Sequence, residues 1–284
     1  MMRRLWRDLV ARALEEDLAW GDVTTESLIP RDVTMRAVAR VREAGVVAGL
    51  PVFEEVFSQL SPSVSVELRA CEGEKVAAGQ VLAVVDGPAW AILAGERVAL
   101  NLLQRACGIA TLTAQFVAAL EGLPTRVLDT RKTTPGLRAL EKYAVRMGGG
   151  TNHRYCLADA VLIKDNHLAV LATQGIDLAG AVRKARDAVG PTVKVEVEVE
   201  SVEDAVRAAE AGADIVMLDN MSLDEMRAAV QAIHGRALTE ASGGVTLERV
   251  RDIAETGVDF ISVGALTHSA RGLDIGLDVI CSGF

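Results

Sequence analysis

Short apolar runs alternate with helical patterns along the last two thirds of the chain. The runs are rich in Val, Ile and Leu and have the length of buried strands; they cover residues 125–130, 160–166, 193–200, 214–220, 236–242 and 260–266. Patterns with the period of an α-helix cover residues 96–122, 135–147, 177–189, 201–211, 222–233 and 246–256. Strands that alternate with helices of about ten residues predict an α/β protein with a parallel sheet.

Polar residues gather at the C-terminal end of each predicted strand. They include Asp129, Lys164, Glu198, Asp219 and Ser242. An open doubly wound sheet would concentrate such residues at one switch point, whereas a (β/α) barrel carries its active site at the mouths of all its strands. About six strands are evident, fewer than the eight of a complete barrel. We therefore expect an incomplete (β/α) barrel over residues 106–267.

The first hundred residues follow a different pattern. A helical period over residues 3–18 precedes a strand-like run at 34–49 and a second helical stretch at 50–60. Residues 64–90 then alternate with period two, which indicates a hairpin or small sandwich. We expect an α+β sandwich domain over residues 1–105, with the C-terminal tail, residues 268–284, packed on it.

The stretch at residues 72–87 is also similar to the turn of lipoyl or biotinyl carrier domains. Such a carrier presents a modified lysine at an exposed hairpin tip. Lys75 lies between Glu74 and Val76, in the part of the pattern that builds the scaffold. A shared sandwich topology without an attached cofactor is the favoured interpretation, and the carrier module is a remote alternative.

Composition and charge restrict the possible ligands. Aromatic residues make up only 4% of the chain, so its core must consist largely of aliphatic side chains, as in parallel α/β proteins. The formal net charge of −9 argues against binding nucleic acid through a broad basic surface. An anionic ligand would therefore need a local basic cluster.

The sequence also predicts a location in the cell. The N-terminal residues contain acids and lack the apolar core of a signal peptide, and no stretch reaches the roughly 18 apolar residues of a membrane helix. Cys71, Cys107, Cys156 and Cys281 have no metal-like spacing and are expected to be buried thiols in a reducing compartment. We expect a cytoplasmic protein that contacts neither membrane nor nucleic acid.

A basic cluster lies within residues 126–164, which contain eight Lys or Arg residues and three acids. Arg138, Lys142 and Arg146 have the spacing of one helix face, and a solvated face is the simpler interpretation of those three. Arg131, Lys132, Arg154 and Lys164 differ because each lies at the end of a predicted strand or in a glycine-rich approach. Arg binds carboxylates in two-point fashion and Lys is a compact partner for phosphate, so these residues predict an anion site. His153 is a candidate donor to the same ligand.

Acidic residues and glycines also lie at the C-terminal ends of the predicted strands. Glu198 and Asp219 could bind ribose hydroxyls, Mg²⁺ or a cationic transition state, and Glu196 on the same strand face has a weaker claim. Ser242–Gly243–Gly244 and Val263–Gly264–Ala265 follow the last two strands. Glycine allows backbone N–H groups to approach a phosphate, and the late loops of such barrels commonly bind one.

These residues stand in long blocks that resemble the quinolinate phosphoribosyltransferases, also called carboxylating nicotinate-nucleotide pyrophosphorylases. The blocks run from GDVTT at 21–25 to GALTHSARGLDIGLD at 264–278. The most specific are DTRKTTPGLRALEKYAVRMGGGTNHR, LIKDNH, VEVEVES, MLDN and ASGG. The resemblance implies an α+β sandwich followed by an incomplete barrel, assembled as a homodimer or a higher oligomer.

The resemblance also implies roles for single residues. Arg131, Arg154 and Lys164, with His153, would hold the two carboxylates of quinolinate, and Arg97 would reach into the site of a partner subunit. Thr130 and Lys132 would flank quinolinate and the pyrophosphoryl group. Glu198 and Asp219 would hold ribose hydroxyls and Mg²⁺, while the loops Ser242–Gly244 and Val263–Ala265 would bind the 5′-phosphate of phosphoribosyl pyrophosphate. Lys132, Lys164, Glu198 and Asp219 are the expected catalytic residues.

The implied reaction is phosphoribosyl transfer to quinolinate with decarboxylation, on the route to NAD. It requires no general base or covalent nucleophile, and the chain contains no Ser/His/Asp arrangement. A pyridine phosphoribosyltransferase that does not decarboxylate, or a molybdenum-transport-associated relative, remains an alternative. The common phosphoribosyltransferase fold carries paired acids after an apolar strand and is disfavoured, because MLDNM contains only one acid.

Overall fold

The computed structural model describes residues 2–280, and the side chains of residues 4–280, which form two compact units. The first unit contains residues 2–114, 133–149 and 266–280, and the second contains residues 115–132 and 150–265. This division differs from the two consecutive segments expected from the sequence, because residues 133–149 belong to the first unit. There Tyr143 packs edge-on against Trp6, with ring centroids 5.4 Å apart.

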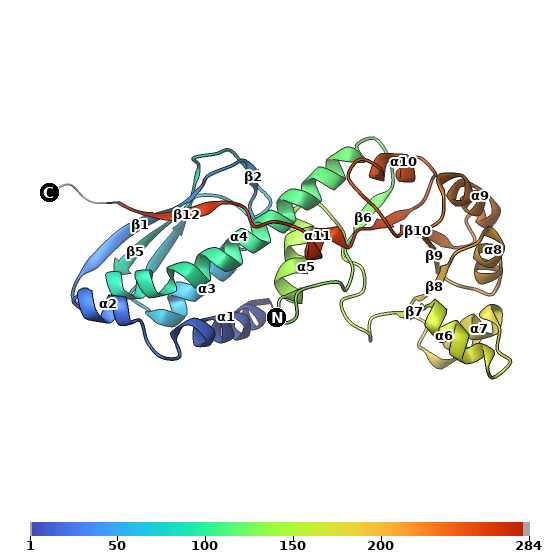
Figure 1. Cartoon of the computed structure of the whole chain (residues 1–284), viewed down its shortest axis with the longest axis horizontal. Coiled ribbons are helices and arrows are strands. Elements are labelled where there is room, and N and C mark those ends of the chain that lie inside the picture. Colours follow the sequence, from blue (N-terminus) through green and yellow to red (C-terminus); the bar gives the residue numbers. More distant parts are fainter. Residues whose placement is uncertain (1, 281–284) are drawn as a thin grey trace. The chain divides into compact units, whose positions relative to one another are not determined.

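The first unit is an α+β module. Its elements are α1 (Met2–Leu18), α2 (Val23–Leu28), β1 (Thr34–Val41), β2 (Gly45–Val46), α3 (Leu50–Leu60), β3 (Ser65–Leu68), β4 (Lys75–Val76), β5 (Val81–Pro88), α4 (Ala89–Ala119), α5 (Arg138–Met147), and β12 (Ile275–Val279). An antiparallel sheet has the strand order β12-β1-β5-β3, and β2 pairs with β4 separately. Strand β12 lies beside β1, with Leu277 opposite Ala39, so the tail of the chain completes the sheet of the first module (Figure 1).

The helix α3 shows why this module folds as it does. It begins after Gly49, whose positive φ of 99° suits glycine, and Pro51 occupies its first turn, where no N–H partner is needed. Its apolar face is buried, and the rings of Phe53 and Phe57 pack edge to face at 5.1 Å. Burial of two Phe side chains contributes about 3–6 kcal/mol.

The second unit contains the predicted parallel sheet. Its elements are β6 (Arg126–Leu128), β7 (Val161–Ile163), α6 (Asp165–Ala172), α7 (Leu178–Ala188), β8 (Val195–Val199), α8 (Val202–Glu210), β9 (Ile215–Asp219), α9 (Leu223–Ile233), β10 (Leu238–Ser242), α10 (Val250–Ala254) and β11 (Phe260–Ser262). The short helix α11 (Ala265–His268) follows β11. Among the described residues the sheet has six strands in the order β6-β11-β10-β9-β8-β7.

The sheet is an incomplete barrel, as predicted. Its neighbouring strands are all parallel, and β6 and β7 occupy the two edges. Helix α8 packs on β8 and β9 and against α9 (Figure 1). The serine N-caps Ser201 and Ser222 begin α8 and α9, and Glu225 completes a capping box at Ser222. Each strand therefore turns into its helix just beyond the C-terminal edge of the sheet, where the polar residues stand.

Three local expectations are wrong. Lys142 does not lie on a solvated helix face, because it is only 2% exposed in the packed side of α5. Cys71 is exposed and Cys156 is partly exposed, whereas Cys107 is buried as expected. Cys281 lies outside the described residues. Helix α6, which begins directly after Lys164, was not anticipated, because the segment reads as the end of a strand.

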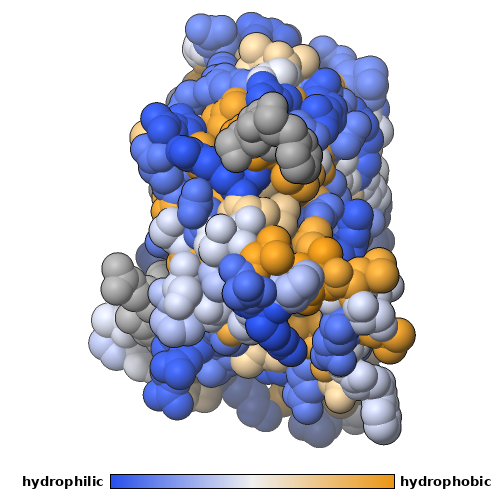
Figure 2. Space-filling view, turned by 90° about the vertical axis from the view of Figure 1, so that its left-hand side faces the viewer, coloured by the Kyte–Doolittle hydropathy of each residue, from blue (hydrophilic) through white to orange (hydrophobic). Residues whose placement is uncertain are grey.

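Exposed apolar side chains gather near α2. Among the described residues Trp20, Val23 and Leu28 are the most exposed large apolar side chains, at 97%, 76% and 71%. Figure 2 shows one face of the molecule, on which hydrophobic residues form patches between hydrophilic ones. Within residues 2–280, no helix is both long enough and apolar enough to cross a membrane.

Candidate active site

A cavity of about 620 Å³ opens at the C-terminal edge of the parallel sheet in the second unit. Most of its lining residues end a strand or follow one directly. They are Thr130, Arg131, Lys132, His153, Arg154, Leu162, Lys164, Glu198, Met217, Asp219, Asn220, Glu240, Ser242, Gly243, Gly244 and Ser262. In-register parallel strands bring these positions together, as the pairing of Ser242 with Asp219 illustrates.

One wall of the cavity is basic. Arg131 and Lys132 follow β6, Lys164 follows β7, and Arg154 lies in the loop between those strands. Burial, and then the neighbouring positive charge of Arg131, lower the pKa of Arg154. Two guanidinium groups that repel each other in this way create a positive potential, which a bound anion would relieve.

The loops that carry these cations are held by local hydrogen bonds. The Lys132 N–H donates to Oγ1 of Thr130 at 3.0 Å. Nη1 of Arg154 donates to the carbonyl of Ala160 at 3.2 Å, which orients the guanidinium along the loop. The cationic groups are thus partly preorganised before any ligand arrives.

A second wall of the cavity carries carboxylates. Glu198 is the last residue but one of β8 (Val195–Val199) and forms an ion pair with Nζ of Lys164, while Asp219 ends β9 and accepts a hydrogen bond from Nδ2 of Asn220 at 2.7 Å. Carboxylate oxygens are the ligands that Mg²⁺ prefers, together with waters and substrate phosphates. The donor chemistry of Glu198 and Asp219 therefore suits a magnesium ion at this wall.

A glycine loop follows β10. Gly243 and Gly244 have positive φ values of 92° and 57°, and a Cβ on Gly243 would lie 2.2 Å from Oδ1 of Asn220. Asn220 itself adopts φ 54° and donates its N–H to the carbonyl of Ser242 at 3.0 Å. Only a glycine fits at position 243 without moving the loop, which leaves backbone groups accessible to a ligand.

Three titratable groups, His153, Glu196 and Glu240, meet beside the basic wall, and His153 and Glu240 line the cavity. Nε2 of His153 lies 3.0 Å from Oε2 of Glu196 and 3.4 Å from Oε2 of Glu240. Burial alone would lower the pKa of His153, but the contacts with Glu196 and Glu240 outweigh it and raise the pKa to about 10. Burial and the charge of Glu240 raise the pKa of Glu196, although His153 opposes this.

The other nitrogen of His153 has a different environment. Nδ1 accepts the Arg154 N–H at 2.8 Å, a contact that requires Nδ1 to carry no proton and so opposes the raised pKa. One such hydrogen bond contributes about 1 kcal/mol. Leaving a buried carboxylate without a cation costs about 3–5 kcal/mol. The two carboxylates therefore favour the imidazolium form of His153, whereas the hydrogen bond to Nδ1 favours the neutral ring.

Asp129 fixes the backbone of the same segment. It is fully buried at the end of β6, where Oδ1 accepts the His153 N–H at 2.9 Å and Oδ2 accepts Nδ2 of Asn152 at 2.5 Å. A carboxylate with both oxygens engaged holds the loop firmly against the sheet. The position of Arg154 in the cavity depends on this anchor.

The cavity brings together most of the residues predicted from the sequence, namely Thr130, Arg131, Lys132, His153, Arg154, Lys164, Glu198, Asp219, Ser242, Gly243 and Gly244. Val263, Gly264 and Ala265 follow the lining residue Ser262 but do not themselves line the cavity. Arg97 is exposed on α4, in the first unit.

Sequence analysis missed Glu240 and Asn220, and it gave Glu196 too little weight. A signal was available for both glutamates. Glu240 lies two residues before Ser242, and Glu196 two residues before Glu198, so each shares a strand face with a residue at the mouth. The period of two therefore pointed these side chains toward the inside of the barrel.

Cations, carboxylates and a glycine loop thus line one barrel mouth, the place where (β/α) barrel enzymes carry their active sites. The family model described as "Quinolinate phosphoribosyl transferase, C-terminal domain" matches residues 109–278, and the corresponding N-terminal domain model matches residues 22–107. The chain therefore belongs to the quinolinate phosphoribosyltransferase family, whose enzymes are pentosyltransferases.

Individual relatives agree with this assignment. The chain is 45% identical over 267 residues to the probable carboxylating nicotinate-nucleotide pyrophosphorylase of Bacillus subtilis, covering 94% of this chain and 91% of the relative. It is 45% identical over 283 residues to the carboxylating nicotinate-nucleotide pyrophosphorylase of Mycobacterium leprae, covering 96% of each protein. The crystal structure of NadC from Streptococcus pyogenes is 40% identical and superposes with a TM-score of 0.90 over 96% of each chain.

Proposed function

We propose that this enzyme transfers the phosphoribosyl group of phosphoribosyl pyrophosphate to quinolinate with loss of one carboxyl group. The products are nicotinate mononucleotide, pyrophosphate and CO₂, and the reaction is a step of de novo NAD biosynthesis. One observation supports the proposal above all: Arg131, Lys132, Arg154 and Lys164 line the same cavity as the carboxylates Glu198 and Asp219 and the glycine loop after β10. The choice of substrate rests on the similar proteins, which are named carboxylating nicotinate-nucleotide pyrophosphorylases, and on the family model, which names quinolinate.

Quinolinate carries two carboxylates and therefore needs several cationic partners. Arg131, Arg154 and Lys164 are the proposed partners, with His153 behind them and Thr130 beside the ring. Guanidinium groups can each bind a carboxylate through two hydrogen bonds. Arg97 would join them from a partner subunit, so that the active enzyme is a homodimer or a larger assembly.

Phosphoribosyl pyrophosphate would bind in the same cavity, beside quinolinate. Glu198 and Asp219 are placed to accept hydrogen bonds from the ribose hydroxyls, and Lys132 to neutralise the pyrophosphoryl group. The loops Ser242–Gly244 and Val263–Ala265 would bind the 5′-phosphate through backbone N–H groups. Magnesium bound near Glu198 and Asp219 would add positive charge at the pyrophosphate.

The chain's own residues then act mainly by positioning. The bond between the anomeric carbon and pyrophosphate breaks, and the carboxylates of the acidic wall stabilise the positive charge that develops on the ribose. The pyridine nitrogen, aligned by the cationic wall, forms the new bond. The bond from C2 to its carboxylate breaks next, its electron pair remains on C2 beside the cationic nitrogen, and a proton replaces the departing CO₂.

Substitution of the cationic wall tests the proposal. Arg131→Ala and Lys164→Ala should abolish quinolinate-dependent CO₂ release, whereas Lys184→Ala, which removes an exposed lysine of α7, should leave it unchanged. If either variant, Arg131→Ala or Lys164→Ala, turned over quinolinate at the wild-type rate, the assigned roles would be refuted.

The same assay separates the alternatives. A pyridine phosphoribosyltransferase that does not decarboxylate would turn over nicotinate and release no CO₂, and a molybdenum-transport-associated relative would turn over neither acid. Light scattering of the purified enzyme would test the proposed dimer. We further propose that the enzyme acts in the cytoplasm, which fractionation of the source cells would test.

A further inference from the structure

Glu196 and Glu240 form a buried carboxylate pair that the reaction described above does not use. They lie on β8 and β10, the two strands that flank β9, and their side chains are 1% and 0% exposed. Both point to a single nitrogen, Nε2 of His153, at 3.0 and 3.4 Å. Two separate strands thus hold one imidazole from the same side.

Most oxygens of these carboxylates accept no hydrogen bond from the described residues. Oε1 of Glu196 and both oxygens of Glu240 are buried without such a bond, so the 3.4 Å contact of Glu240 with His153 is an ion-pair contact. Buried carboxylates that stand close together are tolerated only when a cation or a proton lies between them. The ligand atoms of His153, Glu196 and Glu240 lie within 4.8 Å of one another. The 3.0 Å between Nε2 of His153 and Oε2 of Glu196 is the length of an N–H···O hydrogen bond, so a proton between the two atoms satisfies the pair.

The remaining charged groups around His153 do not replace this contact. From the end of β6, Asp129 engages the His153 backbone rather than its ring. The positive charge of Arg154 acts to lower the pKa of Glu196, and the charge of Arg131 acts to lower the pKa of Arg154. Nδ1 faces the Arg154 N–H at 2.8 Å. Protonation of Nδ1 would require this contact to be released.

We propose that Glu196 and Glu240 are positioning residues that clamp His153 from two strands and keep its ring as an imidazolium. His153 then presents a constant positive charge to the substrate carboxylate over the whole physiological pH range. An imidazole without the clamp would lose its proton near neutral pH, and the basic wall would weaken as the pH rises. The substrate part of this inference rests on the proposed function, whereas the clamp itself is a property of the resting enzyme.

The clamp is tested first without substrate. The enzyme is labelled with ¹⁵N in its histidine rings, and the His153 signals are assigned by their absence in His153→Gln. Wild-type His153 should remain protonated from pH 6 to pH 8.5. Glu196→Gln and Glu240→Gln preserve side-chain shape, remove one charge each, and should lower the His153 midpoint by about one pH unit or more. Glu200→Gln is the matched control: Glu200 is exposed after the same strand, and its loss should leave the midpoint unchanged.

Kinetics then test the consequence for the substrate. In Glu196→Gln and Glu240→Gln the KM for quinolinate should rise about tenfold as the pH increases through the lowered midpoint, a tenfold change being equivalent to about 1.4 kcal/mol. The KM for phosphoribosyl pyrophosphate should change less than about twofold, because His153 is assigned to the carboxylates of quinolinate. A merely structural role would raise both KM values together, independently of pH.

Clear results would overturn the proposal. Titration of wild-type His153 near its ordinary pKa, or an unchanged midpoint in both glutamine variants, would refute the clamp. If one variant did not fold, the midpoint in the other would decide. Absence of quinolinate turnover in the wild-type enzyme would instead refute the proposed function, while the NMR titration would still decide whether the clamp exists.

Discussion

Lys164 and Glu198 form an ion pair between the C-terminal ends of the neighbouring strands β7 and β8. The side chain of Lys164 is 43% exposed and that of Glu198 is 15% exposed. The two residues have different proposed substrates, quinolinate for Lys164 and the ribose for Glu198. Each side chain therefore neutralises the charge of the other, and we expect substrate binding to rearrange this pair.

This relationship predicts an asymmetric effect of Glu198→Gln. The change should lower kcat about 100-fold, because it removes a carboxylate that stabilises the positive charge developing on the ribose. The KM for quinolinate should stay the same or fall, since Lys164 no longer has a competing partner. Steady-state kinetics with each substrate varied would measure both effects. A kcat within twofold of the wild-type value, or a large rise in the KM for quinolinate, would contradict this interpretation.

Gly243→Ala should impair binding of the phosphorylated sugar. The new Cβ would lie 2.2 Å from Oδ1 of Asn220, and the positive φ of 92° disfavours alanine in addition, so the loop must move. We expect the KM for phosphoribosyl pyrophosphate to rise about tenfold or more, equivalent to at least about 1.4 kcal/mol. Gly244→Ala is the control in the same loop, because its Cβ would meet only Nη1 of Arg249, at 3.7 Å. Equal effects of the two variants would show that steric contact at position 243 is not the cause.

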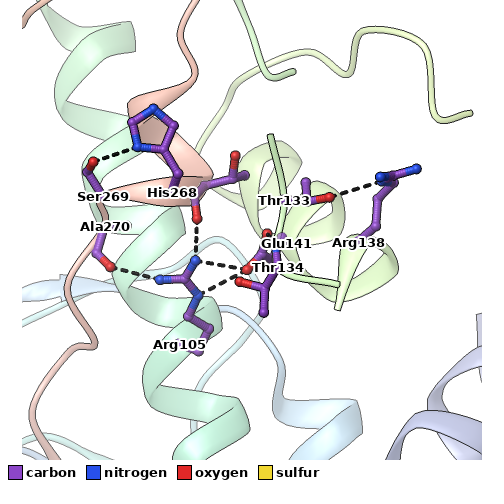
Figure 3. Close-up of polar contacts among 9 residues, drawn as sticks. Arg105, Thr133, Thr134, Arg138, Glu141, His268, Ser269 and Ala270 are labelled. Atoms are coloured by element: carbon purple, nitrogen blue, oxygen red, sulfur yellow. Dashed lines mark hydrogen bonds and ion pairs between the residues drawn. The ribbon is translucent and has the colours of Figure 1, made fainter. Parts of the chain in front are cut away.

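The first unit contains a buried ion pair between Arg105 and Glu141 (Figure 3). Nη2 of Arg105 donates to Oε1 of fully buried Glu141 at 2.8 Å, and Oε2 accepts the Thr134 N–H at 3.0 Å. Arg105 also donates to the carbonyls of Thr267 and Ala270. The network thus connects α4 and α5 with Thr267 of α11 and with Ala270, which follows that helix.

Arg105→Met should therefore destabilise the protein by about 3–5 kcal/mol, because it leaves the Glu141 carboxylate buried without its cation. Urea unfolding would measure this loss. Adding Glu141→Gln to Arg105→Met should recover part of the stability, since the buried charge is then gone. Arg207→Met, which breaks a surface pair with Asp177, should cost less than about 1 kcal/mol and serves as the comparison. A similar small loss for Arg105→Met would show that the buried pair contributes little.

The raised pKa of His153 predicts a pH dependence of stability. Its pKa is about 10 in the folded protein and 6.5 in an unperturbed side chain. The contribution is fully present below pH 6.5 and is lost progressively as the pH rises toward 10, with a slope of up to about 1.4 kcal/mol per pH unit. The unfolding free energies of the wild type and His153→Gln, compared between pH 7 and pH 9.5, should converge as the pH rises. Burial also raises the pKa of the Cys107 thiol, but this affects both proteins equally and cancels in the difference. A constant difference over that range would contradict the prediction.

The local sequence pattern was sufficient to predict the strands of the parallel sheet and many residues of the candidate site. The apolar runs became β6 to β11 because a strand buried on both faces needs a continuous series of Val, Ile and Leu, whichever strand lies beside it. The cavity residues Arg131, Lys164, Glu198 and Asp219 could be predicted because parallel strands bring their C-terminal ends to one edge. These conclusions require only short-range sequence and the direction of the strands.

Pairing across the sheet required the tertiary structure. Glu196 and Glu240 meet at His153 only because β8 and β10 flank β9, and no local pattern states that strand order. Lys142 has the spacing of a solvated face, yet its helix packs that side inward, and Arg105 finds Glu141 across 36 residues of chain. The sequence by itself determined which residues form strands and which groups stand at their mouths, since periodicity and side-chain chemistry are local. Only the folded chain decided which buried charges neutralise each other, because that depends on distances between segments remote in sequence.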